Sequence, residues 1–164
     1  MLIFNILNIL GYSHVSKINN YIYLGNINIS QDKSFLEKNS IDVVVNCSKD
    51  IPFLTNKTKN YRIAVDDNLS HSSIIIMFRY LKNLIPIINH HLLNNKTILI
   101  HCRAGMQRSA TFLSGLLMYN LKISKNKSIA MIKKKRKIAF LPYLNFNLAI
   151  NEYETYLLNN SHLE

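Results

Sequence analysis

The sequence has few cysteines, glycines and prolines, and each shortage excludes a class of protein. Its 164 residues include 2 cysteines, 4 glycines and 3 prolines. Two cysteines cannot build a disulfide scaffold, and so little glycine and proline excludes collagen-like and linker-rich chains. Neither cysteine lies in a C-x-x-C pair or a His/Cys cluster, so we expect no structural zinc site.

Acidic residues are also scarce. The chain carries 9 of them against 20 lysines and arginines, which leaves a net charge of +11. Such a positive field attracts anions, including nucleic acid, acidic membranes and phosphorylated substrates. Asparagine, isoleucine and lysine together fill 60 positions, a bias typical of an AT-rich genome. Charge alone therefore does not separate a functional anion partner from a surface that is simply covered by lysine.

No run of residues reaches the roughly 18 apolar side chains that a membrane-spanning helix needs. Residues 1–10, MLIFNILNIL, are apolar but lack the basic flank and small-residue cleavage site of a signal peptide. We therefore expect a reducing, intracellular compartment. The length of 164 residues predicts one domain, and the hydrophobic fraction of 48% predicts that it is compact and folded.

Strand-like and helix-like segments alternate along the chain. The predicted strands are residues 20–24, 41–46, 61–65 and 97–100. The predicted helices are residues 1–10, 31–39 after an N-cap at Ser30, 73–93 kinked or split at Pro86, 109–121, 125–137 after an N-cap at Ser124, and 145–158. Residues 50–60 are predicted to form a polar loop. The alternation indicates an α/β fold, with a mostly parallel central sheet of four to five strands flanked by helices.

A cysteine directly follows the predicted strand 97–100, at the sheet edge where parallel α/β folds bind ligands. Residues 101–109 read HCRAGMQRS and pass into a helix. Loop amides and a helix N-terminus favour a bound oxyanion and the thiolate of Cys102. Arg108 can hold two phosphate oxygens, Gly105 permits backbone angles forbidden to a side chain, and Ser109 puts a hydroxyl beside the sulfur. A buried core cysteine is the alternative, and this spacing disfavours it.

The pattern H-C-x-x-G-x-x-R-S resembles the signature of the cysteine-based protein phosphatases, in their dual-specificity branch. Residues 21–26, 43–47, 63–68 and 108–111 match the family in order. The resemblance covers about residues 18–156 and is greatest to the small poxvirus virion phosphatases. It implies a protein tyrosine phosphatase-like catalytic domain over residues 15–160, preceded by an apolar arm over residues 1–14. The family's late P-N-x-x-F segment is altered here, with Tyr143 in place of the asparagine.

The resemblance also implies a mechanism that uses no metal and no cofactor. The Cys102 thiolate attacks phosphorus, Ser109 eases its later departure, and His101 is expected to be buried, hydrogen-bonded and to tune the loop. The phosphate-binding loop is made of Arg103, Ala104, Gly105, Met106, Gln107 and Arg108. Asp67 matches the family's general acid and Asp66 is the alternative. Without the cysteine loop, this acidic pair would be interpreted as a solvated turn.

Three substrate hypotheses remain open. The first is a protein phosphatase for phosphotyrosine and phosphoserine/threonine, since no long insert between Asn20 and Asp42 builds deep walls around a ring. The second keeps the catalyst but takes RNA 5′-triphosphate or phosphoinositide. Ala104, Met106 and Gln107 are neutral, which disfavours such polyanions and makes nucleic acid an unexpected partner. The third, a non-catalytic phosphoprotein-binding module, gains no support because the expected catalytic residues are all present.

Other features invite further expectations. Cys47 ends a strand expected beside that of Cys102, so it is a candidate redox partner, although a buried core cysteine is the favoured interpretation.

The run KKKRK at 133–137 fits a nuclear-import or docking patch, but a solvated helix end is favoured. His90 and His91 are interpreted as surface residues. Residues 1–10 are so apolar that we expect them to be buried, either on the flank of their own domain or as a homodimer contact on the same flank of a second copy. The expected location is the host cytoplasm or the virion if the protein is viral, with the nucleus as an alternative.

Overall fold

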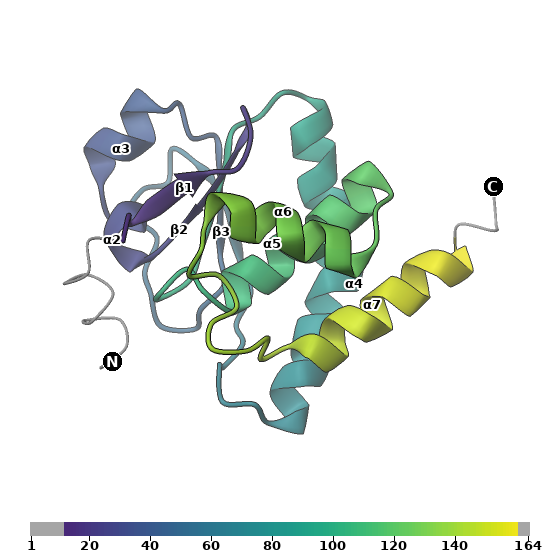
Figure 1. The fold of residues 1–164 in the computed structure, drawn as a ribbon. Coiled ribbons are helices and arrows are strands. Elements are labelled where there is room, and N and C mark those ends of the chain that lie inside the picture. Colours follow the sequence, from purple (N-terminus) through teal and green to yellow (C-terminus); the bar gives the residue numbers. More distant parts are fainter. Residues whose placement is uncertain (1–11, 161–164) are drawn as a thin grey trace.

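The computed structural model describes residues 12–160, which form a central five-stranded sheet with helices on both faces (Figure 1). The strands are β1 (Val15–Lys17), β2 (Ile22–Gly25), β3 (Val43–Asn46), β4 (Lys59–Arg62) and β5 (Ile98–His101). The helices are α2 (Ile27–Ser30), α3 (Lys33–Lys38), α4 (His71–Leu93), α5 (Arg108–Leu121), α6 (Lys125–Lys135) and α7 (Asn147–Asn160). The helix predicted over 1–10 lies outside the described residues, and the domain division at residue 14 stays a prediction.

The sheet has the strand order β1-β2-β5-β3-β4. β2, β5, β3 and β4 are parallel, and only β1 runs antiparallel to its neighbour β2. This confirms the predicted α/β class and the mostly parallel sheet. Within residues 12–160, no helix has the length and apolar character needed to cross a membrane.

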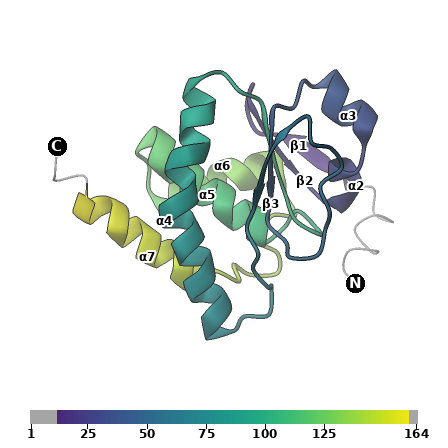
Figure 2. The same ribbon diagram turned by 180° about the vertical axis from the view of Figure 1, so that it is seen from behind.

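Both faces of the sheet are buried, which explains why the central strands are apolar without interruption. Leu24, Val45 and Ile100 point into a large core that is shared with α4, α5, α6 and α7. Their neighbours Val44 and Leu99 face the opposite side and pack in a smaller cluster with residues of α2 and α3. Figure 2 shows α4 and α7 on one side of the sheet and α3 on the other.

The observed starts of two helices differ from those predicted from the sequence. Helix α3 is capped by the side chain of Asp32, which accepts the backbone N–H of Phe35, and not by Ser30. Ser30 instead ends the short helix α2, which the sequence analysis missed. Ser124 does cap α6, as predicted. Helix α4 begins after Ser70 and runs through Pro86 without dividing.

The continuity of α4 has a packing explanation. Pro86 removes one intrahelical hydrogen bond, but it lies on the exposed side of the helix. Leu84, Ile85 and Ile88 on either side are buried in the main core. Burial of these side chains stabilises the helical backbone across the proline, so tertiary packing outweighs the local helix-breaking tendency.

The edge strands differ most from the prediction. β4 occupies Lys59–Arg62, whereas the predicted strand was 61–65, so β4 begins inside the predicted loop. Ile63 and Val65, which were predicted to lie in the strand, follow its end and are buried. β1 was not predicted at all. An edge strand has one neighbour and one buried face at most, so it needs no apolar run and leaves little pattern in the sequence.

The basic run at 133–137 is also corrected. Helix α6 ends at Lys135, with Arg136 as its C-cap residue. Lys133, Lys134, Lys135 and Lys137 are exposed, but only 3% of Arg136 is accessible to solvent. The run is therefore not a uniformly solvated helix end, because one of its five cations points into the protein.

Candidate active site

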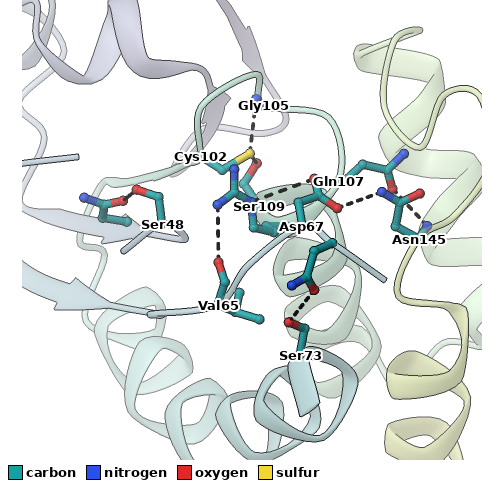
Figure 3. Close-up of polar contacts among 12 residues, drawn as sticks. Ser48, Val65, Asp67, Ser73, Cys102, Gly105, Gln107, Ser109 and Asn145 are labelled. Atoms are coloured by element: carbon teal, nitrogen blue, oxygen red, sulfur yellow. Dashed lines mark hydrogen bonds and ion pairs between the residues drawn. The ribbon is translucent and has the colours of Figure 1, made fainter. Parts of the chain in front are cut away.

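The candidate site lies at the carboxyl end of the parallel strands, as predicted. Cys102 follows β5 directly, and the loop over residues 102–107 leads into α5 (Figure 3). The N-cap residue of α5 is Gln107, whose side chain makes no capping hydrogen bond. No side chain therefore caps the first amides of this 14-residue helix, and the backbone N–H of Ser109 already acts on the Cys102 sulfur, as it would on an anion bound there.

Gly105 meets the backbone requirement that the sequence suggested. Its φ of 68° lies in the left-handed region. A Cβ atom at this position would lie 2.4 Å from the carbonyl oxygen of Gly25 and 2.9 Å from Nη2 of Arg136. Both the backbone conformation and the close approach to β2 exclude a side chain here.

The sulfur of Cys102 accepts two hydrogen bonds. The backbone N–H of Gly105 and the hydroxyl of Ser109 each lie 3.2 Å from Sγ. Burial by itself would raise the pKa of Cys102, but the charge of Arg108 and these hydrogen bonds outweigh it, so the pKa lies below its usual range. The arrangement favours the thiolate, which is the nucleophilic form of cysteine.

Arg108 lies close enough to act on the charge of the sulfur, with 12% of its side chain exposed, and its guanidinium is incompletely paired. Its Nη1 donates a hydrogen bond of 3.3 Å to the carbonyl oxygen of Val65. Its Nε has no hydrogen-bond partner among residues 12–160, and it lies 3.8 Å from Oδ2 of Asp67. A buried guanidinium N–H without a partner is costly in a folded protein, and a bound phosphate oxygen would satisfy it.

The two candidate acids have different surroundings. The carboxylate of Asp66 is paired with Lys49, and 47% of its side chain is exposed. The side chain of Asp67 is 27% exposed, and its carboxylate is the one that faces Arg108. Only Asp67 therefore shares the site with Cys102 and Arg108.

A loop from the end of the chain also reaches the site, through contacts that the sequence analysis missed. The side-chain amide of Asn145 donates a 2.7 Å hydrogen bond to Oδ1 of Asp67. Gln107 donates from Nε2 to the carbonyl oxygens of Leu141 and Tyr143, and its Oε1 accepts the N–H of Asn145. Figure 3 shows this chain of contacts from Gln107 through Asn145 to Asp67.

These contacts give the altered P-Y-L-N-F segment a role. The segment differs from the family pattern at Tyr143, which contributes only its carbonyl oxygen to this network, while its ring is exposed. The asparagine at position 145 supplies the amide that holds Asp67. The sequence does show an asparagine two residues after the position where the family pattern has one. Its hydrogen-bond partner, Asp67, is 78 positions away, so the sequence did not indicate the contact.

The other loop residues have distinct surroundings. Arg103 is exposed and its guanidinium pairs with Asp50, whereas its carbonyl oxygen accepts the N–H of Ile27. Met106 is buried, and its carbonyl oxygen accepts the N–H of Phe140. The Ala104 carbonyl oxygen accepts a hydrogen bond from Arg136.

His101 is buried, as expected, with 1% of its surface exposed. Desolvation lowers its pKa to about 4, so the ring is neutral at pH 7. Nδ1 has no partner among the described residues, while a hydrogen-bond interaction with the Cys102 backbone raises the pKa and partly offsets desolvation. A neutral, buried ring is consistent with an effect on the loop through packing and not with proton transfer.

Cys47 and Cys102 end neighbouring strands. Asn46 of β3 lies opposite His101 of β5, so the two cysteines are the next residues on parallel chains. The N–H of Cys47 donates a 2.7 Å hydrogen bond to the carbonyl oxygen of His101. Both cysteines are free and buried. Burial, reinforced by the nearby Cys102 thiolate, raises the pKa of Cys47 well above its usual range.

The histidine pair lies away from this site. His90 is exposed, and Nε2 of His91 is 2.8 Å from the hydroxyl of Tyr61. Within residues 12–160, no cluster of three or more histidines, cysteines and acids is placed to hold a metal ion.

Comparison with known proteins places this geometry in a family. The model of the dual specificity phosphatase catalytic domain matches residues 22–156. The chain belongs to the dual specificity phosphatase family. It is therefore a cysteine-based protein phosphatase, and the match includes the loop with Cys102 and the loop with Asp67.

Relatives of this dual specificity phosphatase occur in viruses and in animals. The tyrosine-phosphatase-like protein AMV078 of Amsacta moorei entomopoxvirus is 32% identical over 150 residues, covering 87% of this chain and 88% of that protein. Human dual specificity protein phosphatase 9 is 28% identical over 136 residues, which cover 81% of this chain but 34% of that longer protein. The crystal structure of human DUSP28 superposes with a TM-score of 0.79 at 20% identity, covering 89% of this chain and 96% of that one.

Proposed function

We propose that this phosphatase hydrolyses phosphotyrosine and phosphoserine/threonine in proteins through a cysteinyl-phosphate on Cys102. The observation that carries the proposal is the surroundings of the sulfur. Two donors at 3.2 Å and the charge of the partly buried Arg108 favour a thiolate at the start of a loop whose following helix has no side-chain cap.

In the first half-reaction the Cys102 thiolate attacks phosphorus and the bond to the leaving oxygen breaks. Arg108 and the loop amides hold the remaining phosphate oxygens, and the unpaired Nε of Arg108 supplies one of these donors. Asp67 gives its proton to the departing alkoxide or phenoxide. Its place 3.8 Å from Arg108 supports this assignment over Asp66, which is paired with Lys49.

In the second half-reaction Asp67 takes a proton from water as the water attacks the cysteinyl-phosphate. Inorganic phosphate leaves and the thiolate of Cys102 is regenerated. The hydroxyl of Ser109, 3.2 Å from the sulfur, stabilises the charge that returns to it. No cofactor takes part in either step of this proposal.

Two observations favour protein substrates over polyphosphate ones. The chain between β2 and β3 holds only the short helices α2 and α3, so no long insert builds a deep wall for one kind of side chain. The one basic residue among positions 103–107, Arg103, is exposed and has its charge paired with Asp50. The loop therefore offers little extra positive charge to a triphosphate or a phosphoinositide headgroup.

Kinetics on four substrates side by side test this proposal. The substrates are a phosphotyrosine peptide, a phosphothreonine peptide, a 5′-triphosphate RNA and a phosphoinositide. We expect kcat/KM to be highest for the two peptides, and Cys102→Ser to abolish turnover while it retains binding of the phosphopeptide. A higher kcat/KM for the RNA or the lipid would overturn the protein assignment. Turnover by Cys102→Ser within tenfold of wild type would overturn the cysteine mechanism.

We also propose a role for Cys47 and a role for residues 1–10. Cys47 is proposed as a resolving thiol for oxidised Cys102, which is supported by their neighbouring places on β3 and β5. Residues 1–10 are proposed as a homodimer contact, which is supported by the apolar sequence MLIFNILNIL. The similarity to entomopoxvirus AMV078 supports a site of action in an infected host cell or a virion.

A further inference from the structure

Arg136 is the one buried cation of the basic run at 133–137. Only 3% of its surface is exposed, whereas the four lysines around it are exposed. No carboxylate among the described residues lies within ion-pair distance of it, and the sequence has no acidic residue between Asp67 and Glu152. Desolvation lowers its pKa to about 10, so the guanidinium still carries its charge at pH 7. The nearby charge of Cys102 raises this pKa but does not offset the desolvation, and a buried charge without a carboxylate partner is expensive and calls for an explanation.

Backbone oxygens of the phosphate-binding loop take the place of a counterion. Nε of Arg136 donates to the carbonyl oxygen of Gly105 at 2.7 Å, and Nη2 donates to that of Ala104 at 3.2 Å. On its other side, Nη1 donates to the carbonyl oxygen of Ser13 at 3.1 Å and to Oγ of Ser16 at 3.4 Å. The guanidinium therefore ties the loop to β1 and the residues before it.

The two carbonyl groups belong to peptide units whose N–H groups point the opposite way. The oxygen of Ala104 shares a planar trans peptide unit with the N–H of Gly105, and the two bonds are antiparallel. That N–H donates to Sγ of Cys102 at 3.2 Å, while Arg136 holds the oxygen at the other end of the unit. The oxygen of Gly105 is likewise opposed to the N–H of Met106.

We infer that Arg136 is a positioning residue, which holds the peptide units 104–105 and 105–106 with their oxygens outward and their N–H groups toward the sulfur and the phosphate. The planar fork of arginine suits this task, because its donors diverge in one plane and reach two consecutive carbonyl groups. A lysine ammonium is a single point and cannot hold both at these distances. Arg136 itself does not touch the substrate, and the inference rests on the proposed role of Cys102.

The test compares Arg136→Met and Arg136→Lys with Lys135→Met and Lys137→Met. The two control variants remove the same charge from exposed neighbours. Each full-length protein is alkylated with iodoacetamide across a range of pH, with and without vanadate, and modification of Cys102 is followed by mass spectrometry. The vanadate concentration that halves the alkylation rate measures binding by the loop, and thermal melting confirms that each variant is folded.

We expect Arg136→Met to weaken vanadate protection by about tenfold or more, since hydrogen bonds to charged groups contribute on the order of 1.5–3 kcal/mol. Its alkylation midpoint should shift to higher pH, because the Gly105 N–H no longer points steadily at the sulfur. Arg136→Lys should be intermediate, and it serves as the test if the methionine variant does not fold. Both control variants should match wild type.

A folded Arg136 variant with wild-type vanadate protection and wild-type alkylation midpoint would overturn the inference and leave Arg136 a packing residue. Equal losses in the lysine controls would also overturn it, because they would indicate a general effect of surface charge. Turnover of an aryl phosphate by the wild type is measured separately. If wild type binds vanadate but does not turn over, the proposed function fails while the role of Arg136 is still decided.

Discussion

The side-chain amide of Asn145 holds the carboxylate of Asp67 through a 2.7 Å hydrogen bond, although 78 positions separate the two residues. Gln107 links Asn145 to the phosphate-binding loop by accepting the Asn145 N–H at 3.1 Å. On the other side of Asp67, the next residue, Asn68, accepts the hydroxyl of Ser73 in α4. The carboxylate is therefore placed by the terminal loop, the cysteine loop and a helix together.

Asn145→Ala should lower kcat for substrates with poor leaving groups by about tenfold, a part of the roughly 10²–10⁴-fold that a general acid contributes. An activated aryl phosphate needs little protonation, so its kcat should change much less. The matched control is Asn147→Ala, which removes an exposed asparagine two residues further along, at the start of α7. Equal losses on both kinds of substrate would mean that Asn145 acts on the loop as a whole and not on Asp67.

Asp67→Asn should lower kcat for phosphothreonine peptide by about 10²–10⁴-fold, because the amide cannot donate the proton to the leaving oxygen. Asp66→Asn should have a small effect, since that carboxylate is paired with Lys49 at the surface. Steady-state kinetics of both variants on one phosphothreonine peptide and one activated aryl phosphate give the comparison. The reverse order of effects would move the general acid to Asp66.

Ser109→Ala should shift the acidic limb of the kcat/KM profile to higher pH. The hydroxyl of Ser109 donates to the sulfur and helps to lower the pKa of Cys102, so its loss raises that pKa and reduces the thiolate fraction as pH falls. The variant should also accumulate cysteinyl-phosphate, which rapid quenching and mass spectrometry detect. An unchanged acidic limb together with an unchanged burst would refute this role.

Peroxide should convert the two free thiols into a Cys47–Cys102 disulfide. The Cys102 thiolate is oxidised to a sulfenic acid, with reduction of the peroxide to water. The thiol of Cys47 then attacks that sulfur and expels a second water. Mass spectrometry of the oxidised protein measures the bridge, and Cys47→Ser should instead accumulate the sulfinic acid of Cys102. Wild type that forms the sulfinic acid and no bridge would leave Cys47 a core residue.

Removal of residues 1–11 should convert a dimer into a monomer, because the apolar segment MLIFNILNIL would no longer be there to bury against a second copy. Sedimentation velocity at micromolar concentration compares the full chain with a chain beginning at Tyr12. Phosphatase activity on an aryl phosphate serves as the folding control. The dimer proposal fails if both chains sediment as monomers.

Local features of the sequence were sufficient to predict the centre of this protein. The apolar runs of β3 and β5 are continuous because these strands are buried on both faces, and the segment HCRAGMQRS brings its functional groups together within nine consecutive residues. Gly105 at positive φ and Ser109 beside the sulfur follow from short-range geometry. Such features depend on neighbours in the chain, and pattern and spacing record them.

Tertiary structure decided the features whose partners are remote in sequence. The edge strands β1 and β4 carry weak patterns because each has one strand neighbour. Arg136 resembles its lysine neighbours in the sequence, yet only this residue turns inward, where it meets the carbonyl oxygens of Ala104 and Gly105. Nothing in the local sequence distinguishes Asn145 from the other asparagines, and only the folded loop brings its amide to the carboxylate of Asp67. Burial and long-range hydrogen bonds select these residues, and neither is encoded in the local periodicity of the chain.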